Sequence, residues 1–364
     1  FLMKEGDIIT PLTEQAIGLL GSTAIIPESG KYIQSQDVAK IVCKEHLLDK
    51  DFAFYLISSN LVKQQLSAAA QQTKIRHTSP DKIKDCIVWI PELEEQKRIG
   101  KLLRTIDLKI ELNRQLNHNL EAMAKQLYDY WFVQFDFPDE NGKPYKSSGG
   151  KMVWDKRLKR EIPLLWKAKI VEEVADVYNG ATPSTVNELN YGGDIVWITP
   201  KDLSDQKQKF VYQGERNISQ VGYDSCSTHL LPSNTILMSS RAPIGLLAIA
   251  KTELCTNQGF KSFVSKSKNI ATYLYYYLQY HITQIEQLGT GTTFKEVSRE
   301  DILKFPMLKP SDNVLDLWEE IVSALNDRQL EIQKENENLI KQRDELLPLL
   351  MNGQVSVNYD LADD

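Results

Sequence analysis

The chain has 364 residues, of which 42% are hydrophobic, so it is long enough for about two domains with buried cores. No apolar run approaches the ~20 residues of a membrane span and the first residues show no secretory leader pattern, so we expect a cytoplasmic chain without a membrane partner. The net charge of −6 argues against a uniformly basic surface, so a nucleic-acid partner would need a locally basic face or cations from another subunit.

The first predicted globular segment covers 1–91. It contains a helix-like stretch over 51–67 and ends in TKIRHTSPDKIKDCIVWIP over 73–91. Ser79, followed by an acidic and an apolar residue, predicts a capped turn, and the next apolar run predicts a strand that ends at Pro91.

A long helix is predicted over 92–133. Its apolar residues recur in alternating steps of three and four, which is typical of a coiled coil. Asn113 and Asn117 interrupt the apolar seam, where a polar residue often fixes register; rotation of these side chains to solvent is the alternative. Turn residues without periodicity then predict a linker over 134–162.

The second globular segment covers 163–310, with a helix-like stretch over 270–288. A second long amphipathic helix follows over 311–352, with Asn336 at its seam, and a tail occupies 353–364. Neither long helix has a complete polar surface, so we expect the two helices to pack antiparallel and to hold the globular segments apart.

An internal repeat relates the two halves of the chain. TTFKEVSREDILKFPMLKP over 292–310 aligns with 73–91 without a gap, and residues 233–238 match 6–10 more weakly. Only residues 1–5 precede the matching segment in the first copy, whereas the second copy starts at about Pro163. We therefore expect that the first domain lacks its N-terminal part.

Several segments together resemble a known family. They are Trp166 with IVEEV over 170–174, YNGATPS over 178–184, DIVWITPKDL over 194–203, MSSRAPIG over 238–245, TNQGF over 256–260 and PELEEQKRI over 91–99. In their order and repetition they resemble the specificity subunit of type I restriction-modification systems, over essentially the whole chain.

The resemblance implies an α+β fold. Two globular α/β target recognition domains, each reading half of a split double-stranded DNA site, would be separated by two long antiparallel coiled-coil helices with a pseudo-two-fold repeat. It also implies that two methyltransferase subunits dock on the helices and bind S-adenosylmethionine, and it leaves open whether restriction subunits join. The short first domain departs from the family pattern and puts half of the recognition surface in doubt.

Base reading uses amide, hydroxyl and guanidinium groups on loops. Candidates of this kind are Ser239, Ser240, Arg241, Asn257 and Gln258. Lys201, after the apolar run 195–198, is a candidate for a phosphate contact. The alternative for each is a local hydrogen bond, an ion pair with a surface acid or a solvated side chain.

Polar positions that differ between the copies are further candidates, because a shared frame reading two half-sites would vary there. In the first copy these are Gln71, Gln72, Thr73 and Lys74, and in the second Thr290, Thr292 and Thr293. Unconstrained drift in a surface loop is the alternative interpretation.

Motifs that carry catalysis are missing from the sequence. There is no Asn/Asp-Pro-Pro-Tyr/Phe element, Walker lysine, H-E-x-x-H or G-x-S-x-G, and the histidines and cysteines lack metal-ligand spacing. We therefore expect a non-catalytic chain with no metal and no cofactor of its own. A coiled-coil scaffold that binds no DNA, and an enzyme with unrecognised chemistry, are the alternatives.

Overall fold

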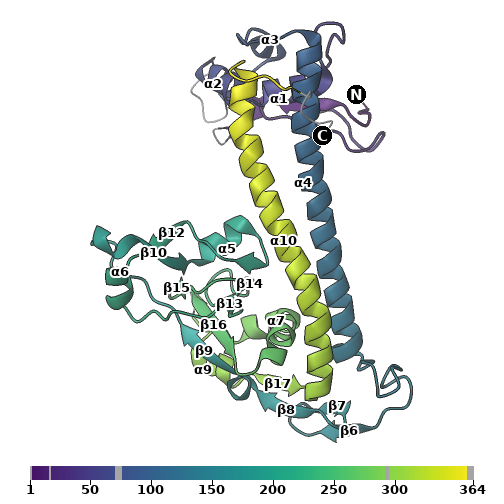
Figure 1. The fold of residues 1–364 in the computed structure, drawn as a ribbon, viewed down its shortest axis with the longest axis vertical. Coiled ribbons are helices and arrows are strands. Elements are labelled where there is room, and N and C mark those ends of the chain that lie inside the picture. The colour runs from purple at the N-terminus through teal and green to yellow at the C-terminus, as the bar shows by residue number, and fades with distance from the viewer. Residues whose placement is uncertain (1, 16–17, 70–75, 292–294, 359–364) are drawn as a thin grey trace. The chain divides into compact units, whose positions relative to one another are not determined.

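The computed structural model describes residues 2–15, 18–69, 76–291 and 295–358. The chain divides into two compact units (Figure 1): unit 1 is Phe1–Leu116 with Lys334–Asp364, and unit 2 is Asn117–Gln333. Each unit contains part of two long helices, α4 (Leu93–Tyr128) and α10 (Asp312–Met351), and a π-helical turn (Asp129–Val133) extends α4. The long helices predicted over 92–133 and 311–352 are thus confirmed.

Unit 1 combines short strands and helices. Its strands are β1 (Ile8–Pro11), β2 (Thr13–Glu14), β3 (Ala24–Ile25), β4 (Val38–Ile41) and β5 (Arg76–His77), and its short helices are α1 (Lys50–Ile57), α2 (Asn60–Ala69) and α3 (Pro80–Lys84). The Asp49 carboxylate starts α1 by accepting a hydrogen bond from the Phe52 N–H at 2.9 Å. Phe52 and Leu56 then pack on Ile99 of α4 and Leu350 of α10, which anchors the segment on the helices.

Unit 2 contains most of the strands. They are β6 (Met152–Asp155), β7 (Arg160–Pro163), β8 (Lys167–Ile170), β9 (Ala175–Asn179), β10 (Tyr191–Ile198), β11 (Phe210–Val211), β12 (Arg216–Ile218), β13 (Ile236–Ser239), β14 (Leu247–Ala250), β15 (Cys255–Thr256), β16 (Phe260–Ser265) and β17 (Pro306–Lys309). Its helices, besides α4 and α10, are α5 (Pro200–Gln206), α6 (Gln220–Asp224), α7 (Ala271–Tyr280), α8 (Ile282–Gln287) and α9 (Arg299–Leu303).

The main sheet of unit 2 has five strands in the order β11-β14-β13-β16-β9, and a second sheet has the order β12-β10-β15. One face of the main sheet contributes Val177, Ile236 and Phe263 to a core that includes Tyr273 of α7 and Trp318 of α10. The globular part of unit 2 is therefore built directly onto its segment of the helices (Figure 1).

The sheets of the two units confirm the internal repeat. In unit 1, β1 lies between β3 and β4, and Ile8 pairs with Ile25 and Ile41. In unit 2, β13 lies between β14 and β16 in the same antiparallel manner, and Ile236 pairs with Ile249 and Phe263. The weak match of 6–10 with 233–238 thus marks the central strand of the same three-stranded arrangement in each unit.

The helix-like stretches of both copies are broken helix pairs, α1–α2 and α7–α8. After each pair comes the expected capped turn: the Ser79 hydroxyl accepts from the Lys82 N–H at the start of α3, and the Ser298 hydroxyl from the Asp301 N–H at the start of α9. The serine signal therefore has the same structural meaning in both copies.

The final strand forms in one copy alone among the described residues. In unit 2, β17 pairs antiparallel with β8. Residues 85–91 of unit 1 are not a strand, and no described strand of that unit lies beside them, so the predicted strand ending at Pro91 is wrong. An apolar run needs a hydrogen-bonding neighbour as well as a pattern to become a strand.

Within each unit, α4 and α10 run side by side in opposite directions (Figure 1). In unit 1, Asn113 is 3% exposed, and its Nδ2 donates to Glu335 Oε2 at 2.7 Å and to Asn336 Oδ1 at 3.0 Å. In unit 2, Asn117 Nδ2 donates to the Gln329 carbonyl at 3.3 Å. These side chains turn into the seam and not to solvent, which is the geometry that their predicted role in register requires.

The segment 134–162 is packed and folded, so its interpretation as a simple linker is wrong. It contains the β6–β7 hairpin, and Phe135 and Phe137 are buried. The Phe137 ring stacks on Trp166 with centroids 5.0 Å apart. The turn residues around Asn141 led to the prediction of a linker, although the aromatic side chains beside them belong to the core of unit 2.

Candidate nucleic-acid interface

Loops from distant parts of the sequence meet at one end of the strands in the main sheet of unit 2, where β13 and β9 end and β16 begins. We call this end of the sheet the loop edge. Arg241, just after β13, forms an antiparallel bridge with Glu296, and Glu296 exchanges two backbone hydrogen bonds with Thr290 at 3.1 and 3.0 Å. The Ser240 N–H donates to the Gly259 carbonyl at 2.7 Å, which ties in the loop before β16. The predicted candidates around 239–241, 257–258 and 290 are therefore brought together.

A chain of charges supports Arg241. Its Nε donates to Glu296 Oε2 at 3.0 Å, and Lys261 Nζ lies 3.2 Å from Glu296 Oε1. Burial by itself would raise the pKa of Glu296, but the adjacent Lys261 and Arg241 outweigh it and hold the pKa below its usual range. Lys261 is buried, whereas almost half of the Arg241 side chain is exposed. Since a guanidinium has five N–H groups, Arg241 keeps donors for a ligand while Glu296 orients it.

Ser239 and Ser240 do not fit the predicted role in base reading. Both are fully buried, and the Ser239 hydroxyl donates to the Pro243 carbonyl at 2.6 Å and accepts from the Leu246 N–H at 2.8 Å. The Ser240 hydroxyl accepts from Lys261 at 3.3 Å. The two serines stabilise the loop that carries Arg241 by hydrogen bonds inside the domain. The prediction that they contact DNA directly is therefore wrong.

Asn257 and Gln258 lie in a turn that approaches a fourth loop. Asn257 Oδ1 accepts from the Gly259 N–H at 2.9 Å, and the exposed Gln258 accepts a hydrogen bond from the Thr182 hydroxyl. A Cβ at Gly180 would lie 2.2 Å from the carbonyl oxygens of Thr256 and Asn257, so only glycine permits this approach. The loop after β9 therefore belongs to the same edge.

Lys201 is in the first turn of α5 and not in a loop. Its Nζ lies 2.8 Å from Glu215 Oε2, and both side chains are exposed. The hydrogen bond from Lys201 and the charge of Glu215 raise the pKa of Lys201. The alternative interpretation, a solvated lysine with a surface partner, fits this position better than a free phosphate contact.

Several candidates cannot be placed. Gln71, Gln72, Thr73, Lys74, Thr292 and Thr293 lie outside the described residues. Their predicted role remains a prediction.

The corresponding edge of unit 1 is closed by β2 and β5, where Thr13 pairs with His77 and Glu14 with Arg76. Glu14 is 2% exposed, and one of its oxygens accepts the N–H groups of residues 18, 19 and 20 at 2.8 to 3.0 Å. Arg76 Nη1 lies 3.1 Å from its other oxygen. Burial raises the pKa of Glu14, but the three backbone donors and Arg76 together leave it below its usual range.

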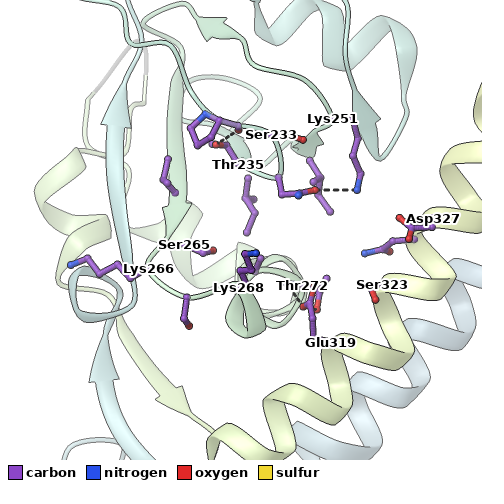
Figure 2. A pocket seen from close by; sticks show the side chains of 18 residues that line it. Ser233, Thr235, Lys251, Ser265, Lys266, Lys268, Thr272, Glu319, Ser323 and Asp327 are labelled. Carbon is purple, nitrogen blue, oxygen red and sulfur yellow. Dashed lines mark hydrogen bonds between the residues drawn. The ribbon is translucent and has the colours of Figure 1, made fainter.

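A cavity of about 590 Å³ lies at the other end of β13 (Figure 2). The turn before β13, the start of α7 and one face of α10 line it, and Thr272 Oγ1 donates to Glu319 Oε2 across it at 2.6 Å. Lys251 Nζ donates to Asn234 Oδ1 at 3.1 Å. Burial raises the pKa of Glu319. None of the candidates from the sequence lines this cavity.

Comparison with known proteins decides the family. The sequence pattern described as "Type I restriction modification DNA specificity domain" matches residues 1–122 and 163–342, which is most of the chain. The chain belongs to this family. The two matched ranges of the specificity-domain family begin in the two copies of the internal repeat and include much of the long helix that follows each.

Individual relatives agree. The type I restriction enzyme MjaIX specificity subunit of Methanocaldococcus jannaschii is 35% identical over 197 residues, which are 52% of this chain and 46% of that relative. The match thus spans less than half of that relative's length. The type I restriction enzyme HindI specificity subunit of Haemophilus influenzae is 24% identical over 375 residues, covering 89% of this chain and 81% of the relative.

The fold has a solved counterpart in the S subunit of a type I restriction-modification system from M. genitalium. The TM-score is 0.61 at 15% identity, over 96% of this chain and 83% of that one. At this identity the likeness concerns the fold. Within the described part of this specificity-domain chain, no group of three or more His, Cys, Asp or Glu side chains is placed to hold a metal ion. No described helix is long and apolar enough to cross a membrane.

Sequence reasoning missed the residues that stabilise the two edges, namely Glu14 and Arg76 in unit 1 and Gly180, Thr182, Lys261 and Glu296 in unit 2. Glu296 and His77 occupy the same position of the repeat alignment, so the signal was present. The role of this position could not be predicted, because a β-bridge joins residues that are far apart in sequence, such as Arg241 and Glu296.

Proposed function

We propose that this chain is the non-catalytic DNA sequence-specificity subunit of a cytoplasmic type I restriction-modification assembly. The observation that carries the proposal is the family match to both copies of the repeat. Two copies of one frame with different edge loops are suited to reading two different halves of one DNA site. Arg241, half exposed and held by Glu296 through Nε, is the residue that we expect to contact a guanine.

The helices are the proposed docking surface for two methyltransferase subunits, which would bind S-adenosylmethionine and carry the chemistry, with restriction subunits as further partners. Leu108, Leu112 and Leu116 repeat every four residues on α4 and are 53%, 61% and 38% exposed. An apolar stripe on one face of a helix is typical of a protein contact. The net charge of −6 is consistent with partners that supply part of the phosphate neutralisation.

The test is selection of bound sequences from randomised DNA by the chain co-purified with its methyltransferase partner. We expect a two-part motif from the native chain. Arg241→Ala should lose preference at one position of one half-site, at a cost of about 1–3 kcal/mol, while the other half-site is unchanged. Lys156→Ala removes an exposed charge on the β6–β7 turn and serves as the matched control.

The scaffold alternative predicts a different outcome. If the assembly selects no sequence at any salt concentration, the proposed function is wrong and the chain joins proteins without reading DNA. If Arg241→Ala affects both half-sites equally, its assignment to base reading is wrong, because a general loss of affinity is the signature of a phosphate contact.

A further inference from the structure

Lys209 links the main sheet of unit 2 to the long helices. It directly precedes β11, the edge strand of the main sheet, and its carbonyl accepts from the Ile249 N–H at 2.8 Å. The backbone of Lys209 is therefore part of the same sheet that presents Arg241 at the end of β13.

The side chain of Lys209 leaves the sheet and enters the helix pair. Its Nζ donates to Glu121 Oε2 on α4 at 2.8 Å, to Asn326 Oδ1 on α10 at 2.7 Å and to Tyr276 Oη on α7 at 2.6 Å. Gln329 Oε1 on α10 lies 3.1 Å away. One ammonium group, with three protons, thus contacts three helices from different parts of the chain.

The residues on either side of Lys209 form hydrogen bonds with α10. Gln333 Nε2 on α10 donates to Gln208 Oε1 at 2.8 Å and to the Phe210 carbonyl at 2.9 Å. Three consecutive residues are therefore fixed to α10 by hydrogen bonds with defined directions. The apolar core beneath them stabilises the contact but is non-directional, so it defines the angle of the domain less sharply.

The charge at this point depends on Lys209. Glu121 Oε1, the second oxygen of the carboxylate, is buried and has no hydrogen bond among the described residues. Burial lowers the pKa of Lys209 to about 8, and Glu121 opposes that effect, so the amine stays charged at neutral pH. Removing either partner would leave the other buried and uncompensated.

We propose that Lys209 is a positioning residue that sets the angle at which the second recognition domain sits on its helices, and so determines the spacing between half-sites that the assembly accepts. The inference rests on the proposed function in DNA reading. Lys209 itself lies away from the recognition loops and contacts only side chains and backbone of unit 2 among the described residues.

The test measures spacing selectivity in the complete complex. DNA substrates carry the native half-sites with the native spacer, or with one base pair added or removed, and initial methylation rates are compared. Lys209→Met should reduce the ratio of native to altered spacing by about 10- to 100-fold, the effect that misplacement of about 1 Å has on a positioned site. Lys209→Arg, which keeps the charge, should restore part of the ratio.

Two further variants keep the test decisive. In Lys209→Met with Glu121→Leu no charge is left unpaired, so this double variant should fold even if Lys209→Met does not, and it should show the same loss of selectivity. Lys266→Met is the matched control, because Lys266 is exposed and bonds Asp176 and the Glu172 carbonyl within the domain.

The outcomes separate the two proposals. An unchanged spacing ratio in a folded Lys209 variant would overturn the positioning role while leaving DNA reading intact. Lack of sequence preference in the native complex would overturn the proposed function itself. A loss of thermal stability with an unchanged ratio would show that Lys209 only stabilises the fold.

Discussion

In both units a tyrosine of the globular part donates a hydrogen bond to a carboxylate on α4, but the cation that pairs with this carboxylate comes from different places. In unit 1, Tyr55 on α1 donates to Asp107 on α4 at 2.5 Å, and Arg343 on α10 pairs with Asp107 at 2.9 Å. In unit 2, Tyr276 on α7 donates to Glu121 on α4 at 3.1 Å, but the cation is Lys209 of the globular domain. The helices of unit 1 neutralise their own polar cluster, whereas those of unit 2 need the domain to do so.

The largest expected effect breaks the cluster of unit 2. Glu121→Leu should destabilise unit 2 by about 3–5 kcal/mol, because Lys209 remains buried without its counter-charge. Asp107→Leu should cost unit 1 less, about 2 kcal/mol, because Arg343 keeps its exposed partner Asp344 and the Tyr55 hydroxyl alone loses its acceptor. Hydrogen exchange read separately in each unit measures both, and equal losses would refute the asymmetry.

A second difference concerns how the stability of unit 1 depends on pH, through the buried Glu14. Because its folded pKa is lowered, Glu14 contributes stability that is present above its ordinary pKa of 4.5 and is lost as the pH falls through the lower folded value. Glu14→Gln should therefore cost about 2 kcal/mol at neutral pH and make unit 1 less sensitive to pH below about 4.5. Thermal unfolding between pH 3 and 7 tests this; parallel curves for native chain and variant would argue against it.

The shared part of the frame predicts equal effects. Ser79→Ala and Ser298→Ala each remove a hydroxyl that accepts a hydrogen bond from the N–H three residues on, so each should cost about 1 kcal/mol in its own unit. Exchange of the amides in α3 and α9 reports the two caps. Ser323→Ala, on the half-buried face of α10 that lines the cavity, removes no helix cap and is the control that should change neither.

The smallest expected effect lies in the seam. Asn113→Leu replaces a polar contact with an apolar one, so stability should change by less than about 1 kcal/mol. If Asn113 fixes register, the variant should instead show mixed pairing of α4 and α10, detectable by cross-linking of paired cysteines. A single unchanged cross-link pattern would show that register is set elsewhere.

Local signals were readable in the sequence and long-range pairings were not. Ser79, Ser298 and the helix over 92–133 depend on neighbours a few residues away, and they were predicted correctly. Ser239 and Ser240 were taken for loop residues, because pattern alone cannot tell the buried end of β13 from the loop that follows it. Lys209 carried no signal at all, since each partner of its ammonium group is more than sixty residues away in sequence.

The burial of Phe135 and Phe137 against Trp166 bears on how the chain can be divided. A fragment cut at Pro163 would uncover the Trp166 side chain and remove most of the β6–β7 hairpin, leaving an aromatic surface prone to aggregation. A fragment starting at Asn117, the first residue of unit 2, keeps these rings together with Ala124 and Tyr128 of α4, which belong to the same core. For anyone expressing or grafting the second recognition domain, the natural cutting point therefore lies about 45 residues ahead of where the repeat in the sequence begins.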